Sequence, residues 1–327
     1  MPKLMNDADA YVDEVLDGLI LTDARLAREG RAVTLAEGAR KGVAIVSGGG
    51  SGHFPLFVGY TAPGFIDACA VGDVFAGPSV AACESAIRAA DRGQGALLLY
   101  GNYGGDKMNF DMASEMVELD DIRCETVLGT DDIASGGAEE ADKRRGVAGL
   151  VLLYKIAGAA ADRGDDLDTV ARITREAGAN LRTVGIATSS CTLPGAPGPS
   201  FTLEAGKVEL GMGIHGEPGL WRDDLRGADA LADEMVERLL ADPVAQRSGR
   251  VCLMLNSLGA TPLEELLILY RRAAARLEEA GITVALPMIG HFATSMEMGG
   301  MSMSLMHLDE EREALLRAPS DCRYWRV

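Results

Sequence analysis

The chain has 327 residues, of which 47% are hydrophobic and 24% charged, and its formal net charge is −18. This length and composition predict a globular protein of about two domains. The strong negative charge excludes a surface built to bind a nucleic-acid backbone or an anionic membrane.

The cysteines and the amino-terminal segment indicate a cytoplasmic protein. Six cysteines are widely spaced and form no C-x-x-C pair, which is typical of reduced thiols and not of a disulfide framework or a zinc site. The first residues lack the apolar core of a signal peptide, and no apolar run reaches about 18 residues.

The first part of the chain predicts strands that alternate with helices. A helix with Asn6 or Asp7 as its cap opens this part, and its apolar residues from Tyr11 to Ile20 follow helical spacing. Strands are expected at residues 43–46, 65–71, 96–100 and 122–128, and further helices at 79–90 (with Ser79 as N-cap), 107–117, 146–162 and 166–182. This alternation predicts a first domain built on a doubly wound, mostly parallel sheet.

A second, smaller α/β (α+β) domain is expected to follow. Residues 192–199 contain three prolines and two glycines, which predict a linker. The expected domains are residues 1–190 and 200–327. In the second, strands are expected near 201 and at 207–210, 250–255, 283–286 and 301–307, and helices at 228–240 and 262–280, before a short acidic helix at the end.

A glycine-rich stretch, residues 47–53, follows the first predicted buried strand and ends at His53. Its glycines allow close approach of the backbone to a small ligand and backbone φ > 0. It is neither a P-loop, because no lysine follows, nor a dinucleotide fingerprint, because His53 stands where the third glycine belongs. A flexible turn with an incidental histidine is the alternative interpretation.

Two further glycine-rich loops carry candidate chemical groups. Asp106 ends the loop 101–106 and is either a general base beside a ligand or a helix N-cap. His215 lies between glycines in the loop 211–219 and is either an accessible nucleophile or a hydrogen-bonded structural histidine. A metal site made of His53, His215 and Asp106 is a third alternative, which nothing in the spacing favours, so we predict no metal.

Together these loops resemble a known family over essentially the whole chain. The matching motifs are residues 48–53 (GGGSGH), 72–79 (GDVFAGPS), 101–110 (GNYGGDKMNF), 209–219 (ELGMGIHGEPG) and 294–305. They resemble the substrate-binding subunit (DhaK) family of dihydroxyacetone kinases. The resemblance implies two α/β domains and a homodimer.

The resemblance also implies roles for individual residues. His215 would hold a short hydroxyketone as a covalent hemiaminal, Asp106 would act as general base on the terminal hydroxyl, and His53 would assist. Gly50, Ser51, Gly52 and Gly101 would line the substrate pocket. No cofactor would bind this chain, because ATP with Mg²⁺, or ADP recharged by a phosphoprotein, would sit on a nucleotide-binding (DhaL-like) partner subunit.

Two departures from the family pattern bear on the substrate. Phe54 and Gly101 stand where dihydroxyacetone-specific members carry Glu and Lys. We interpret this loss of charged groups as extra room in the pocket, which favours a four-carbon ketose such as erythrulose, with dihydroxyacetone as the runner-up. The alternative function is a non-catalytic hydroxyketone-binding coactivator or sensor of the same fold.

Overall fold

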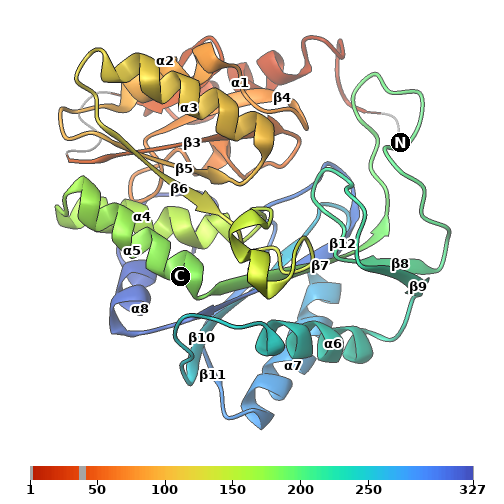
Figure 1. Ribbon diagram of the computed structural model, residues 1–327. Helices are drawn as coiled ribbons and strands as arrows, with labels where there is room; N and C mark the ends of the chain where they lie inside the picture. The colour runs from red at the N-terminus through yellow and green to blue at the C-terminus, as the bar shows by residue number, and fades with distance from the viewer. Residues whose placement is uncertain (1–2, 37–41, 327) are drawn as a thin grey trace.

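The computed structural model describes residues 3–36 and 42–326, and its strands form two six-stranded sheets (Figure 1). The first sheet has the order β1-β2-β4-β3-β5-β6 and the second β11-β10-β12-β7-β8-β9. The predicted α/β class is therefore confirmed. None of the helices in these residues is long and apolar enough to cross a bilayer.

The first sheet is mostly parallel, as predicted. Its strands are β1 (Leu26–Glu29), β2 (Ala32–Leu35), β3 (Ala44–Ser51), β4 (Ala68–Val74), β5 (Ala96–Gly101) and β6 (Cys124–Gly129). The four strands β3 to β6 run parallel, and the hairpin β1–β2 joins antiparallel to β4. This hairpin was not predicted, because two four-residue strands in a polar segment show no strong alternation of apolar and polar residues.

The second sheet is mixed, because only β10 and β11 run parallel. Its strands are β7 (Leu181–Ser189), β8 (Lys207–Leu210), β9 (Trp221–Asp224), β10 (Arg250–Ser257), β11 (Thr283–Gly290) and β12 (Gly299–His307). Strands β7 and β9 were not predicted, and no strand forms near Phe201. Because β7 pairs with β12, the chain passes into the second sheet before residue 190. The division into domains 1–190 and 200–327 stays a prediction.

Helices form three layers around the two sheets (Figure 1). Helices α2 (Val80–Ala90) and α3 (Gly104–Glu118) cover one face of the first sheet, and α1 (Tyr11–Thr22), α4 (Leu150–Arg163) and α5 (Leu167–Ala179) cover the other. Helices α6 (Ala228–Ala241) and α7 (Leu263–Glu279) pack on the outer face of the second sheet. Helix α8 (Glu310–Arg317) packs on α4, and short 3₁₀ turns occur at Val58–Tyr60 and Ala138–Lys143.

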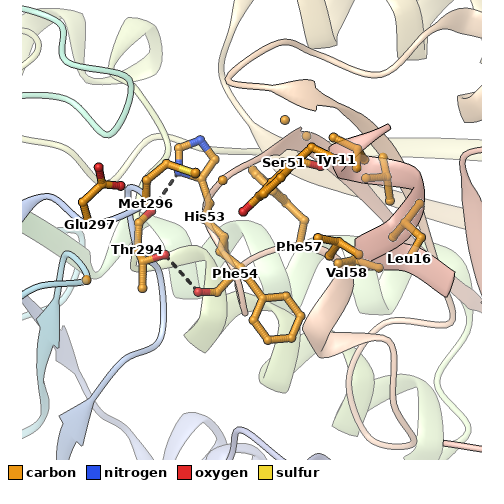
Figure 2. Close-up of a pocket in the computed structure, with 18 of the residues that line it drawn as sticks. Tyr11, Leu16, Ser51, His53, Phe54, Phe57, Val58, Thr294, Met296 and Glu297 are labelled. Carbon is orange, nitrogen blue, oxygen red and sulfur yellow. Dashed lines mark hydrogen bonds between the residues drawn. The ribbon is translucent and has the colours of Figure 1, made fainter. Parts of the chain in front are cut away.

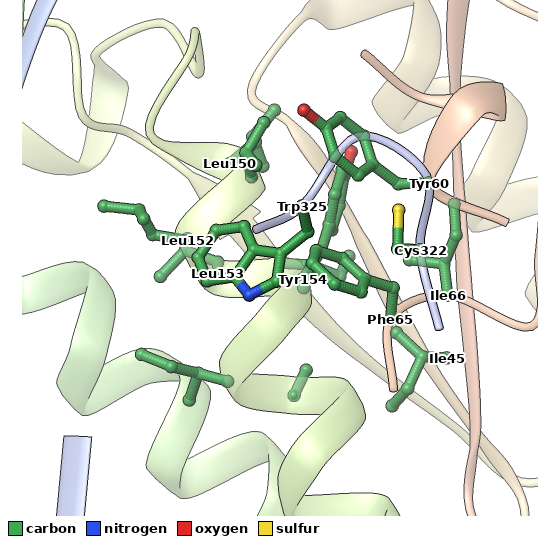
Figure 3. Close-up of a cluster of buried hydrophobic side chains, with 14 of the residues drawn as sticks. Ile45, Tyr60, Phe65, Ile66, Leu150, Leu152, Leu153, Tyr154, Cys322 and Trp325 are labelled. Carbon is green, nitrogen blue, oxygen red and sulfur yellow. The ribbon is translucent and has the colours of Figure 1, made fainter. Parts of the chain in front are cut away.

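One buried core joins both sheets through α4. Side chains of β3, of α4 and of the second-sheet strands β10 and β12 belong to the same apolar cluster (Figure 3). Trp325, near the end of the chain, packs edge-on against Phe65 with ring centroids 5.3 Å apart. Tyr154 of α4 hydrogen-bonds Ser47 of β3 at 2.7 Å, so α4 is tied to the strand that leads to the site.

Two helix caps test the local predictions. Ser79 caps α2 by accepting from the N–H of Ala82, as predicted. Helix α1 instead begins after Ala10 without a side-chain cap, so the predicted caps Asn6 and Asp7 are wrong. Asp7 accepts from the N–H of Asp9 in the preceding turn.

The expected glycine loop is largely strand. Gly48, Gly49 and Gly50 lie in β3 and pair with residues 70–72 of β4. A Cβ atom on Gly49 would lie 2.3 Å from the ring of Phe57, and one on Gly48 would lie 2.7 Å from the carbonyl of Ala70. These glycines therefore serve close packing, and only Gly52 (φ 97°) has the left-handed conformation expected of a flexible turn.

We expect Gly49→Ala to lower the free energy of unfolding by about 1–3 kcal/mol, because the added methyl must displace Phe57. Urea denaturation measures the change. Gly104→Ala is the matched control, since nothing lies within 4 Å of its Cβ position at the start of α3. Equal destabilisation by both substitutions would contradict the steric explanation.

Candidate active site

The candidate site lies where the carboxyl ends of β3, β4 and β5 meet a loop from the second half of the chain. Parallel strands place their carboxyl ends at one edge of the sheet, where α/β proteins bind ligands. His53 follows β3, and residues 211–219 follow β8. The rings of His53 and His215 touch edge to face, with centroids 4.8 Å apart, so two candidates far apart in sequence come together.

His53 is completely buried and held in one orientation. Its Nδ1–H donates to the carbonyl of Thr294 at 2.8 Å (Figure 2). Phe75 stacks on the ring at 4.9 Å and Phe57 meets its edge at 6.1 Å. Burial, together with the charge of His215, lowers the pKa of His53 to about 3. The ring is therefore neutral, and its Nε2 is an acceptor without a protein partner.

Unusual backbone conformations surround His53. Within the described residues, four non-glycine residues have positive φ, and three of them, Phe57, Phe75 and Met296, adjoin the His53 loop. Phe57 and Phe75 contact the ring, and the N–H of Met296 donates to the carbonyl of Gly52 at 2.7 Å. Such conformations persist only where the surrounding packing enforces them, and they cluster at functional sites.

Asp106 lies in the first turn of α3, but it is not the N-cap. Tyr103 occupies the cap position without a side-chain cap bond, so the N-cap interpretation of Asp106 is wrong. The carboxylate is 7% exposed, and its Oδ1 has no hydrogen-bond partner. Gly77 makes room for it, because a Cβ there would lie 2.2 Å from Oδ1. Burial raises the pKa of Asp106 to about 6, partly opposed by the charge of His215.

His215 is partly accessible, with 22% of its side chain exposed. Its Nδ1 lies 3.1 Å from Oε1 of Glu217, and its ring meets the edges of Tyr103 and Phe75 at 4.9 and 5.5 Å. Ser295 donates to the carbonyl of Ile214 and so holds the loop. Because Nδ1 faces a carboxylate, it carries the proton, and the lone pair of the neutral ring is on Nε2.

The predicted lining residues Gly50, Ser51, Gly52 and Gly101 adjoin the site, and their contact with a substrate stays a prediction. A Cβ on Gly50 would lie 2.8 Å from the backbone nitrogen of Ala76, so glycine permits this packing. The Ser51 hydroxyl donates to the carbonyl of Gly72 at 2.9 Å.

The expectation of extra room for a substrate at positions 54 and 101 stays a prediction. The Phe54 ring packs against Tyr324 at 5.1 Å, and Figure 2 shows it directed away from the His53 ring. The space beside Gly101 is filled by Tyr103, whose ring would lie 2.9 Å from an added Cβ. Phe54 lines the same cavity as His53.

A cavity of about 530 Å³ adjoins the loop that carries His53. It lies between α1 and the end of β3, and Figure 2 shows the side chains around it. Gly50 to His53 line it, but His215 and Asp106 do not. Its walls are mainly apolar, so we assign the chemistry to the polar cluster formed by His53, Tyr103, Asp106 and His215 and not to this cavity.

Three buried polar atoms without partners belong to residues of the polar cluster. Among the residues the structure describes, six buried side-chain atoms lack a hydrogen-bond partner, and three of them are His53 Nε2, Asp106 Oδ1 and Tyr103 Oη. Buried polar atoms are nearly always paired, so this group indicates a place for a small polar ligand. The same residues include no set of three or more histidine, cysteine or acidic side chains gathered as metal ligands.

Comparison with known proteins identifies the family. A family model described as the Dak1 domain matches residues 17–324. The chain belongs to the Dak1 family. It is 42% identical to a PTS-dependent dihydroxyacetone kinase subunit, the dihydroxyacetone-binding subunit DhaK of Listeria innocua, over the full length of both. It is 41% identical to L-erythrulose kinase of Pectobacterium atrosepticum and spans 56% of that protein.

Solved structures agree with this assignment. The dihydroxyacetone kinase of C. freundii in complex with AMP-PNP and Mg²⁺ matches with a TM-score of 0.90 and 34% identity, over 99% of this chain and 60% of that chain. The dihydroxyacetone kinase operon co-activator Dha-DhaQ matches with a TM-score of 0.90 and 31% identity, over 98% and 99% of the two chains. The Dak1 fold is thus shared by kinases and by a co-activator.

Sequence reasoning missed four residues that shape the cluster: Phe75, Gly77, Tyr103 and Glu217. All lie inside the motifs that carry the family resemblance. Their side chains became relevant only when the loops were seen together, since Phe75 and Tyr103 contact His215 from different strand ends.

We expect Asp106→Asn to raise the free energy of unfolding at pH 7 by as much as about 3 kcal/mol. The native pKa of about 6 lies above the ordinary value of 3.8 for an aspartate, so ionisation of Asp106 opposes folding above pH 6. The advantage of the variant should shrink between pH 6 and pH 4 and vanish below. Urea denaturation across this range measures it, and a variant less stable than wild type at pH 7 would contradict the assignment.

Proposed function

We propose that this chain is the substrate-binding subunit of a hydroxyketone kinase. In this proposal His215 captures a short ketose as a hemiaminal, and the chain presents a terminal hydroxyl to a nucleotide-binding partner subunit. The observation that carries the proposal is the set of unpartnered buried atoms on His53, Tyr103 and Asp106, in a chain of the Dak1 family. The rings of His53 and Tyr103 pack against His215.

The capture step uses the lone pair on Nε2 of His215. Nε2 bonds to the carbonyl carbon, the π electrons move to the carbonyl oxygen, and that oxygen takes a proton from solvent. The ring then carries a positive charge, which the Glu217 carboxylate at Nδ1 balances. Only a carbonyl compound can accept this bond, so polyols of similar size such as glycerol are excluded.

Asp106 and His53 act on the hydroxyl groups of the captured ketose. The Asp106 carboxylate would take the proton of the terminal hydroxyl as that oxygen bonds to the terminal phosphorus of the nucleotide on the partner subunit, and the bond from this phosphorus to the departing ADP would break. Its pKa of about 6, raised by burial, suits a general base at neutral pH. The neutral His53 accepts a hydroxyl hydrogen bond at Nε2, since its Nδ1 proton is engaged by Thr294.

The phosphoryl donor belongs to the partner. ATP with Mg²⁺, or ADP recharged by a phosphoprotein, binds a DhaL-like subunit in this proposal and not this chain. The relative with AMP-PNP and Mg²⁺ supports the first donor, and the PTS-dependent relative from Listeria innocua supports the second. A homodimeric assembly in the cytoplasm completes the proposal and follows from the family resemblance and the cysteine pattern.

The substrate is a ketose of three or four carbons. Relatives of similar identity carry the names dihydroxyacetone kinase and erythrulose kinase, and we retain erythrulose as the first candidate. The second candidate function is a hydroxyketone-binding co-activator, which the similarity to Dha-DhaQ favours. A buried, unpartnered Asp106 supports the kinase, because capture alone needs no general base.

We expect ketose capture to require His215. Titration calorimetry should show saturable binding of dihydroxyacetone, D-erythrulose or L-erythrulose to wild type and no binding to His215→Ala. With 2-¹³C-labelled dihydroxyacetone, the carbonyl signal should be replaced by that of a tetrahedral carbon. His291→Ala is the matched control, because His291 is exposed, and glycerol is the ligand control. Equal ketose binding by wild type and His215→Ala would overturn covalent capture.

We expect Asp106→Asn to retain ketose binding and to lose phosphorylation by at least about 100-fold when assayed with a nucleotide-binding partner subunit. This result separates the two candidate functions, because a co-activator would show no phosphorylation in wild type either. Higher catalytic efficiency for dihydroxyacetone than for both erythrulose enantiomers would reject erythrulose as the substrate.

We expect the phosphorylation rate to fall about tenfold per pH unit below pH 6, because the base must be ionised. His53 stays neutral over this range, since its pKa is about 3. A rate that does not change between pH 5 and pH 7, measured with the holoenzyme at saturating ketose, would contradict the role of Asp106.

A further inference from the structure

The Glu217 carboxylate binds His215 at two points. Oε1 lies 3.1 Å from the ring nitrogen Nδ1, and Oε2 accepts the backbone N–H of His215 at 3.0 Å. Burial alone would raise the pKa of Glu217, but the hydrogen bond and charge of His215, with help from Arg145, lower it to about 2. Glu217 is therefore ionised at working pH and offers acceptors only.

Arg145 approaches the same carboxylate from the first half of the chain. Its Nη1 lies 3.8 Å from Oε2 of Glu217. Its Nε donates to Asp132 at 2.9 Å, and its Nη2 donates to the carbonyl of Gly211 at 3.0 Å. Asp132 is 4% exposed, and its backbone N–H donates to the carbonyl of Arg145. The contacts with Asp132 and Gly211 thus hold the Arg145 guanidinium in place beside Glu217.

Gly213 makes this approach possible. A Cβ at Gly213 would lie 2.1 Å from Oε2 of Glu217 and 2.5 Å from Nη1 of Arg145. Only the absence of a side chain lets the carboxylate and the guanidinium reach the base of the His215 loop. The glycine therefore supports the ion pair as well as the turn.

We propose that Glu217, held by Arg145 and Asp132, is the positioning residue that keeps His215 in the Nδ1–H tautomer. This inference rests on the proposed function, in which Nε2 of His215 is the nucleophile. In the opposite tautomer Nε2 carries the proton and has no lone pair to attack a carbonyl. The tautomer thus determines whether the loop can capture a ketose.

The two-point contact makes the role testable by a single isosteric change. In Glu217→Gln the side-chain oxygen must face the backbone N–H of His215, which can only donate. Arg145 favours an oxygen at the same position, because its charge is positive. The amide NH₂ then faces Nδ1, so Nδ1 must accept and the proton moves to Nε2. A comparable exchange of a histidine-orienting carboxylate for an amide, in serine proteases, lowers kcat about 10⁴-fold.

The experiment is ¹⁵N NMR of the full chain labelled in its four histidines, without ketose. Wild type should show His215 with a protonated Nδ1 and an unprotonated Nε2. Glu217→Gln should reverse this assignment and weaken dihydroxyacetone binding about 10- to 100-fold. His53 is the internal reference, because Thr294 holds its tautomer independently. Glu204→Gln, on an exposed residue, is the charge-matched control and should change neither result.

Arg145→Lys is the second variant, in case Glu217→Gln fails to fold. It keeps the charge but cannot bond Asp132 and Gly211 together, so it should give a mixture of His215 tautomers and an intermediate loss of binding. A wild-type His215 with the proton on Nε2, or an unchanged tautomer in both variants, would overturn the positioning role. A tautomer reversal in Glu217→Gln, together with a wild-type protein that binds no ketose, would instead overturn the proposed function alone.

Discussion

The hydrogen bond from Nδ1 of His53 to the carbonyl of Thr294 joins two segments separated by 241 residues. Backbone hydrogen bonds join the same two segments, residues 52–54 and 294–296, along a contact that we call the seam. The N–H of Thr294 donates to the carbonyl of His53, and the N–H of Met296 donates to that of Gly52. The Thr294 hydroxyl adds a bond to the carbonyl of Phe54. This seam places residues from the first sheet against the loop that precedes β12, and the site depends on it.

Close packing around the seam explains the glycines and the strained residues together. Gly48 to Gly50 let β4, Phe57 and residues 75–76 approach β3 more closely than any side chain would allow. Phe57 and Phe75 adopt positive φ and enclose the His53 ring. The result is a rigid pocket wall in which a neutral histidine is held in one tautomer, as a preorganised site requires.

The polar cluster combines satisfied and unsatisfied groups. The Nδ1 nitrogens of His53 and of His215 each have an acceptor, whereas Nε2 of His53 and Oδ1 of Asp106 have no partner. An ionised carboxylate that is buried without a partner at one oxygen opposes folding. The pKa of Asp106 is raised for the same reason, since burial disfavours its charged form. Such a group persists where binding or catalysis uses it, which agrees with the assignment of function to this cluster and not to the apolar cavity beside α1.

The sequence by itself determined the elements with strong local patterns and the identity of the chemical groups. Helix α2 with its Ser79 cap and the buried strand β5 follow from periodicity and capping, and the order of the glycine motifs led to the family. Tertiary contacts decided the rest. Strand β7 forms because it pairs with β12 more than 100 residues later, and β3 extends through its glycines because β4 pairs with them. The partner of the His53 nitrogen, the room that Gly77 leaves for Asp106 and the direction of Phe54 arise between distant segments, and local patterns carry no record of such contacts. The contact of His215 with Glu217 is local in sequence, but the Arg145 guanidinium that approaches Glu217 comes from the first half of the chain.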